Sequence, residues 1–197
     1  MSNLLVLLFV LLNNLVLPPD NSVKRHFVET IKKYNLVYSH PKGYKFIKPQ
    51  NEYLEIGDSL SFSNVLFTES KDKKVLIGFY FQKLDTSNQV ETDSPSLAFA
   101  KKIVWMDIDR YNRNLGREKP RIHPYNQTSM LNASISGEYG LRMQNPFLGR
   151  YSNCKMRFFE KFDQLLVFVF YLYQPDHEKT VEKIMEDTFD ILKFGKK

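Results

Sequence analysis

Leu-Leu-Val-Phe-Val-Phe-Tyr-Leu-Tyr, at residues 165–173, is the stretch that decides the fold. All nine side chains are aliphatic or aromatic, and none is charged. A short apolar run of this kind, rich in β-branched and aromatic residues, is typical of a strand that is covered on both faces. We therefore expect residues 165–173 to form an inner strand, with other strands of one sheet beside it.

Two segments before this strand alternate between apolar and polar residues. Apolar or small side chains occupy every second position over residues 135–143, and Asn145-Pro146 is expected to end that strand. Cys154, Met156 and Phe158 alternate with two basic residues, which predicts an amphipathic strand over 154–158. The three segments together indicate consecutive strands in the second half of the chain.

The first half predicts one helix and several short strands. Apolar residues recur at helical spacing over residues 22–34, and Ser22 is a suitable cap. Strands are expected at 36–38, 44–47, 60–67 and 75–81. The alternation changes phase near Asn64, which indicates a bulge or break there, and the polar residues 69–74 predict a hairpin turn before 75–81.

Two more helices complete the expected order of elements. A stripe of apolar residues from Leu97 to Leu115 predicts a central helix that begins at Ser94-Pro95, and residues 116–131 are expected to be irregular. Pro175-Asp176 opens a last helix whose apolar side is expected to reach Leu192. The order favours an α+β fold, a central antiparallel sheet of about six or seven strands flanked by an N-terminal, a central and a C-terminal helix. We expect residues 21–197 to form a single domain.

The N-terminal residues 1–20 predict an export signal or hydrophobic leader. Nine apolar residues run from Leu4 to Leu12, and Pro18-Pro19 would end any helix. The run has about half of the roughly 20 residues that a membrane-spanning helix needs. It lacks a preceding Lys or Arg and a small-residue cleavage motif, so two alternatives stay open: a hydrophobic first helix of a cytoplasmic protein, or a start site further upstream.

Composition narrows the class of protein. Of the 197 residues 43% are hydrophobic and 14% aromatic, which excludes a disordered chain. The formal charge of +6 is moderate, and it favours solubility or weak attraction to anionic surfaces over nucleic-acid binding. The single Cys154 cannot form an internal disulfide, and we expect it to be a small buried residue of its strand.

The second half resembles the PsbP/Mog1-like family. The residues that carry the resemblance are the small-residue strand Ile135-Ser-Gly-Glu-Tyr139, the apolar strand 165–173 and a closing helix over 176–194. The early Pro41-Lys-Gly-Tyr-Lys-Phe46 resembles that family's opening turn and strand. The resemblance implies a central antiparallel sheet flanked by helices. It implies no activity, because members serve as assembly factors, accessory proteins and partner-binding modules, and no functional residue of the family transfers to this chain.

A basic stretch at the end of the predicted central helix is the sharpest candidate for a binding site. Arginine side chains suit carboxylates and phosphates, and this stretch holds one acid, Glu118. We predict binding of an acidic partner here, against the alternative of a solvated loop whose arginines pair within the fold. The candidate residues are Arg110, Arg113, Arg117, Lys119, Arg121 and His123.

No catalytic or metal-binding motif stands out in the sequence. The four histidines lack the spacing of a zinc site, and eight glycines form no phosphate-binding loop. We therefore expect no metal, no cofactor, no nucleic acid and no stable membrane span after processing. The expected function is an exported binding or accessory domain, periplasmic or secreted from a bacterial cell, that engages a protein or envelope component. The alternative is a hydrolase with dispersed catalytic residues that acts on an acidic substrate, and it needs a pocket that holds His123 or Glu138 beside an arginine.

Overall fold

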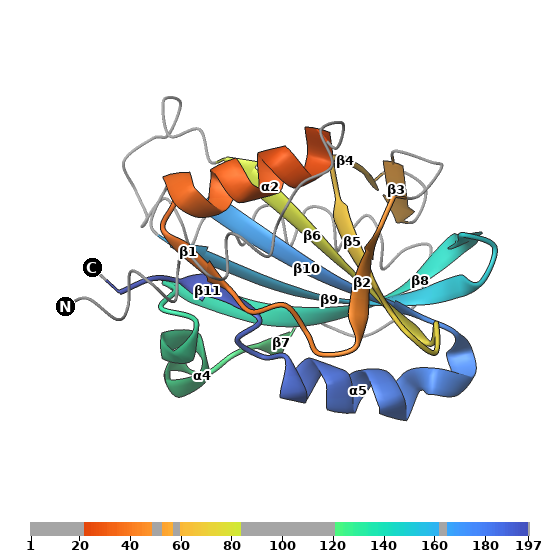
Figure 1. The fold of residues 1–197 in the computed structure, drawn as a ribbon. Coiled ribbons are helices and arrows are strands. Elements are labelled where there is room, and N and C mark those ends of the chain that lie inside the picture. The colour runs from red at the N-terminus through yellow and green to blue at the C-terminus, as the bar shows by residue number, and fades with distance from the viewer. Residues whose placement is uncertain (1–21, 49–52, 57–59, 84–120, 162–164, 197) are drawn as a thin grey trace.

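The computed structural model describes residues 22–48, 53–56, 60–83, 121–161 and 165–196 (Figure 1). The predicted leader and the central helix expected over 94–115 lie outside these ranges. The described elements are α2 (Ser22–Lys33), β1 (Leu36–Tyr38), β2 (Tyr44–Ile47), β3 (Tyr53–Ile56), β4 (Leu60–Ser63), β5 (Leu66–Ser70), β6 (Val75–Lys83), β7 (Arg121–Ile122), α4 (Tyr125–Met130), β8 (Ile135–Phe147), β9 (Tyr151–Lys161), β10 (Leu165–Tyr173), the 3₁₀ turn η1 (Pro175–His177), α5 (Glu178–Asp187) and β11 (Leu192–Phe194).

Seven of the strands form one antiparallel sheet in the order β2-β5-β6-β10-β9-β8-β7. The sheet and the helices around it confirm the predicted α+β class and the expected number of strands. All nine residues of β10 are buried, and the strand lies between β6 and β9 as an inner strand should. The hairpin predicted around the turn at residues 69–74 is also confirmed, because the strands on its two sides, β5 and β6, pair with each other.

The two faces of the sheet carry separate hydrophobic clusters. One cluster packs side chains of β6 and β10 against Phe27 of α2, Val181 and Met185 of α5, and the small sheet formed by β1 and β11. In Figure 1, α2 and α5 cross this face at opposite ends, with β1 and β11 between them. The other cluster includes residues of the β3–β4 hairpin. The face that carries α2 and α5 is the one that positions the site described below.

The break expected near Asn64 is present. Asn64 has a φ of 59°, so the backbone changes direction there, and asparagine tolerates this left-handed conformation better than most residues. As a result β4 pairs with β3 in a two-stranded sheet of its own, while β5 joins the large sheet. The sequence analysis did not predict β3, a strand of four residues.

The last helix is shorter than its apolar spacing predicts. α5 ends at Asp187, and Thr188 hydrogen-bonds through Oγ1 to the Ile184 carbonyl at 2.6 Å. Leu192, expected on the helix, lies in β11 opposite Tyr38 of β1. Helical spacing in the sequence cannot reveal that a distant strand offers backbone hydrogen bonds at this point, and those bonds outweigh continuation of the helix.

Two other expected boundaries were wrong. β8 continues past Asn145-Pro146 to Phe147, and its pairing with β9 changes register between Arg142 and Phe147. This irregularity accommodates a proline, because the interrupted ladder does not require its missing N–H. The segment expected to be irregular over 116–131 contains β7 and α4. β7 forms because Arg121 and Ile122 pair with Glu138 and Gly137 of β8.

Candidate functional site

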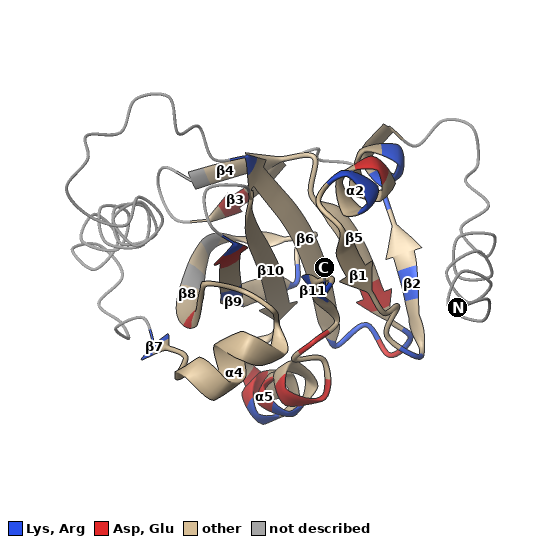
Figure 2. Ribbon diagram, turned by 90° about the vertical axis from the view of Figure 1, so that its left-hand side faces the viewer, with Lys and Arg blue, Asp and Glu red and all other residues tan. Residues whose placement is uncertain are grey.

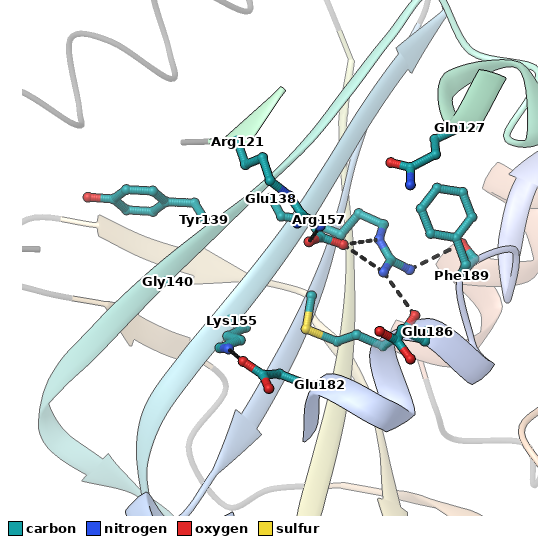
Figure 3. A pocket seen from close by; sticks show the side chains of 11 residues that line it. Arg121, Gln127, Glu138, Tyr139, Gly140, Lys155, Arg157, Glu182, Glu186 and Phe189 are labelled. Atoms are coloured by element: carbon teal, nitrogen blue, oxygen red, sulfur yellow. Dashed lines mark hydrogen bonds and ion pairs between the residues drawn. The ribbon is translucent and has the colours of Figure 1, made fainter. Parts of the chain in front are cut away.

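A pocket of about 510 Å³ lies where β8 and β9 meet the C-terminal half of α5 (Figure 3). Strand alternation places Glu138 and Gly140 of β8 on the face that α5 covers, beside Lys155 and Arg157 of β9, their direct cross-strand partners. The residues that line the pocket are Arg121, Gln127, Glu138, Tyr139, Gly140, Lys155, Arg157, Glu182, Met185, Glu186 and Phe189.

A row of three charged residues crosses β7, β8 and β9 at the edge of this pocket. Arg121 and Arg157 are the cross-strand neighbours of Glu138 on its two sides. Arg121 Nη2 lies 3.0 Å from Glu138 Oε2, and Arg157 donates to Oε1 from Nη2 at 2.8 Å and from Nε at 3.2 Å. One carboxylate therefore binds two guanidinium groups, one of them through two hydrogen bonds.

Arg157 is almost completely buried, with 1% of its surface exposed. Its Nη2 also donates to the Met185 carbonyl at 2.9 Å, and its Nη1 donates to the Phe189 carbonyl at 3.2 Å and lies 3.4 Å from the Tyr171 hydroxyl. The Phe189 ring lies 4.4 Å from the guanidinium carbon. Each nitrogen of this guanidinium thus has a partner in the fold, and the side chain holds the end of α5 against the sheet.

Glu138 is held as a carboxylate. Burial alone would raise its pKa, but the adjacent His123 ring and the Arg157 guanidinium outweigh this effect and lower the pKa to about 2. The side chain keeps 19% of its surface exposed, so it contributes a fixed negative charge to the pocket wall. A carboxyl group in this state accepts hydrogen bonds at neutral pH and has no proton to donate.

His123 joins this cluster to a second, uncharged chain of polar groups. Its Nε2 lies 3.4 Å from Glu138 Oε1, and its Nδ1 lies 3.0 Å from Ser136 Oγ, which in turn lies 2.9 Å from Thr128 Oγ1. In the neutral ring, a proton on Nε2 faces the carboxylate, and Nδ1 then accepts the Ser136 hydroxyl proton. The order serine, histidine, carboxylate is also that of a hydrolytic triad.

The position of Ser136 opposes that catalytic interpretation. Ser136 is 0% exposed and is not among the residues that line the pocket. A nucleophile must reach the carbonyl carbon of its substrate, and this hydroxyl faces His123 and Thr128 of the buried chain. The arrangement stabilises the junction of β7, α4 and β8.

The opposite wall of the pocket is also made of paired charges. Lys155 Nζ lies 2.7 Å from Glu182 Oε1 and 3.5 Å from Glu178 Oε1, both on α5. The lining as a whole holds three basic residues and three glutamates, so its formal charge is zero. Such a pocket suits a polar group with complementary hydrogen bonds better than a bare anion.

The structure places two of the six predicted binding residues, Arg121 and His123. The Arg121 side chain is 73% exposed at the rim of the pocket, whereas His123 is buried. The other four lie outside the described residues: Arg110, Arg113, Arg117 and Lys119. Binding of an acidic partner by the six residues stays a prediction.

Sequence reasoning missed Lys155 and Arg157 as site residues. Their alternation with Cys154, Met156 and Phe158 was interpreted as the polar face of an amphipathic strand, and the structure covers that face with α5. Cys154 itself is fully buried, as expected, and burial raises the pKa of its thiol. Arg157 lies directly across from Glu138, and this pairing would have marked it as a site residue. The pairing can be recognised only once the register of β8 and β9 is known.

Two further results concern ligands and membranes. Within the described ranges, no three His, Cys, Asp or Glu side chains gather as metal ligands. No helix in the same ranges has the length and apolar character that crossing a bilayer requires.

Comparison with known proteins gives one structural likeness. No family model and no curated protein matches the chain. The solution structure of cyanobacterial PsbP (CyanoP) from Synechocystis sp. PCC 6803 matches with a TM-score of 0.42 and 7% sequence identity, over 83% of this chain and 88% of that one. We draw no functional conclusion from a likeness at this level, and membership of the PsbP/Mog1-like family stays a prediction.

Proposed function

We propose that this chain is an exported, non-enzymatic binding or accessory domain that recognises a protein or envelope component at the β8–β9–α5 pocket. The predicted leader supports export to the periplasm or the medium of a bacterial cell. The mass of the mature N-terminus tests that part, because a chain that keeps Met1 or Ser2 would favour the cytoplasmic alternative.

The pairing of the charged groups in the pocket carries the proposal. Arg157 has a partner in the fold for each of its nitrogens, and Glu138 stays ionised between two guanidinium groups. Groups held in this way keep their positions and charges whether or not a ligand is present. They can recognise a polar surface of matching shape, but they offer no proton for transfer at neutral pH.

Arg121 is the residue through which we expect a partner to bind. Its side chain is largely exposed, and Glu138 contacts one of its terminal nitrogens. The remaining N–H groups can receive an acidic side chain of the partner, while Gln127 and Glu186 at the pocket wall can hydrogen-bond to neighbouring polar groups.

The test is capture of a partner by the immobilised full chain, in which Arg121→Glu is compared with Lys179→Glu. Lys179 is exposed on α5 and does not line the pocket, so both variants change the net charge equally. We expect Arg121→Glu to lose a specific envelope component that the wild type and Lys179→Glu retain. Equal retention by both variants would remove Arg121 and the pocket from the account.

The order of Ser136, His123 and Glu138 favours hydrolysis as a second candidate function. It requires that Ser136 become accessible, and this can be measured with a fluorophosphonate probe that labels reactive serines. Burial of the hydroxyl predicts no label on Ser136 in the folded chain. Stoichiometric labelling of Ser136 that disappears in His123→Ala would favour the hydrolase over the binding domain.

A further inference from the structure

The net charge of the protein lies in one short segment. Residues 22–48 hold seven basic residues and one acidic residue, Glu29, while the other 170 residues hold 21 of each. This segment forms α2, β1 and β2. The formal charge of +6 of the whole chain therefore equals that of this part alone.

The fold brings the elements that carry these basic residues together at one edge of the molecule. Lys24 of α2 lies over the Phe46 ring of β2, 4.9 Å from its centroid, so the helix and the edge strand of the large sheet are in contact. Figure 2 shows the basic segments of α2 and β2 on the same side of the molecule, and a group of acidic segments on α5, away from them. Six basic residues of the segment 22–48 are exposed, and together we call them the basic edge: Arg25, Lys32, Lys33, Lys42, Lys45 and Lys48.

The basic edge differs from the pocket in how its charges are compensated. None of its six residues forms an ion pair with a carboxylate in the described ranges. Glu69, the cross-strand neighbour of Lys45, is already bound by Arg150 and by the Tyr151 hydroxyl at 2.8 Å. Within the described part of the chain these positive charges are exposed and unpaired with carboxylates, as a surface for a charged partner requires.

Helix stability does not explain all of the basic residues. Lys32 and Lys33 lie in the last turn of α2, where cations are favoured by the helix dipole. Lys24 and Arg25 lie in the first turn, which has no acidic residue, and there a cation costs a few tenths of a kcal/mol. The contact with Phe46 accounts for Lys24, while Arg25 is exposed and opposes the local preference, as a residue used in recognition would.

We propose that the basic edge binds the surface of an anionic lipid bilayer. Six of the seven basic residues are lysines, which are compact, hydrated point charges suited to diffuse attraction toward many headgroups. Nine residues, 13–21, separate the apolar run from α2 and span at most about 30 Å. Before processing removes the leader, a chain whose apolar run enters a bilayer therefore holds the basic edge close to the headgroups.

The experiment measures partitioning of the full chain onto phosphatidylcholine vesicles with and without phosphatidylglycerol. The leader contributes to both vesicle types, so the ratio of the two partition coefficients isolates the charge effect. We expect the double variant Lys32→Gln/Lys45→Gln to lose about tenfold or more of this ratio, since each lysine near an anionic surface contributes about fivefold. Raising the salt concentration should reduce the wild-type ratio.

The matched control is Lys179→Gln/Lys183→Gln, which removes two exposed lysines from α5. It should change the ratio by less than twofold, and unfolding midpoints should show that both variants fold. Equal losses in the two variants would attribute the binding to net charge alone and overturn the proposal. No preference for anionic vesicles would also overturn it. Binding to duplex DNA in place of vesicles would assign the edge to nucleic acid.

Discussion

The basic edge and the β8–β9–α5 pocket both contain lysine and arginine, but these side chains differ in burial and in pairing with carboxylates. In the pocket, Arg157 and Lys155 are buried or half-buried and each lies against a glutamate. On the basic edge, Lys32 and Lys45 are exposed and have no carboxylate partner among the described residues. The difference teaches that a buried positive residue with a counter-charge from the fold contributes to stability, whereas an exposed one, on the basic edge or at the pocket rim, can contact a partner. Substitutions of the buried pairs should therefore affect folding, and substitutions on the basic edge should affect binding.

Arg157→Met is expected to have the largest effect on stability. It removes the guanidinium that binds Glu138 and the carbonyls at the end of α5, and breaking a buried ion pair costs about 3–5 kcal/mol. Urea unfolding followed by circular dichroism measures the change. Arg25→Met on the basic edge is the matched control and should stay within about 0.5 kcal/mol of wild type. Similar losses in both variants would remove the distinction between the two regions.

Glu138→Gln should destabilise the protein by about 3 kcal/mol at neutral pH, because Arg157 loses its charged partner. The effect should depend on pH. The folded pKa is about 2, below the ordinary value of 4.5, so the wild type has this stabilisation above pH 4.5 and loses it as the pH falls toward 2. Unfolding midpoints of the two proteins should therefore converge in acid. A gap that persists at pH 2 would contradict the assignment.

Thr188→Val should have a smaller effect, about 1 kcal/mol. The Thr188 hydroxyl lies 3.0 Å from the Tyr171 hydroxyl and donates to the Ile184 carbonyl, so it joins the end of α5 to β10. Valine keeps the shape and removes both hydrogen bonds. Thermal unfolding measures the loss, and an unchanged midpoint would show that Arg157 alone holds the helix end.

The smallest effect is expected for Lys32→Gln/Lys45→Gln, the double variant of the vesicle experiment. Neither lysine has an ion pair to lose within the described ranges, so the free energy of unfolding should change by less than about 0.5 kcal/mol. Removal of two like charges from a segment of net charge +6 slightly reduces its self-repulsion. A loss above about 1 kcal/mol would show that the basic edge also has a structural role.

The sequence predicts much of the sheet because alternation and apolar runs are local signals. Strand β10 and the α2 helix follow directly from such patterns. The end of α5 could not be predicted, since Leu192 leaves the helical stripe in order to pair with a strand 154 positions earlier, at Tyr38. The inclusion of Pro146 in β8 could not be predicted either, because it depends on an irregular register between β8 and β9.

The candidate site was accessible to sequence reasoning only in part. Arg121 and His123 were singled out for their basic surroundings, and Glu138 for its place in the alternative hydrolase. Arg157 was not, because a basic residue on an amphipathic strand is usually solvated, and only the packing of α5 shows that this one is buried. The concentration of charge in residues 22–48 can be counted from the sequence. That α2 and β2, which carry most of these residues, lie side by side follows from the contact of Lys24 with Phe46.

The most direct test of the account is the pKa of the Glu138 carboxyl group, measured by NMR titration of the side-chain carbon. The account holds that the pocket charges are fixed in pairs by the fold, and it predicts a pKa of about 2, with the His123 ring and the Arg157 guanidinium as the causes. In Arg157→Met, if folded, the pKa should rise. A wild-type value near the ordinary 4.5 would contradict the account, because it would show a solvated carboxyl group whose neighbours do not hold its charge.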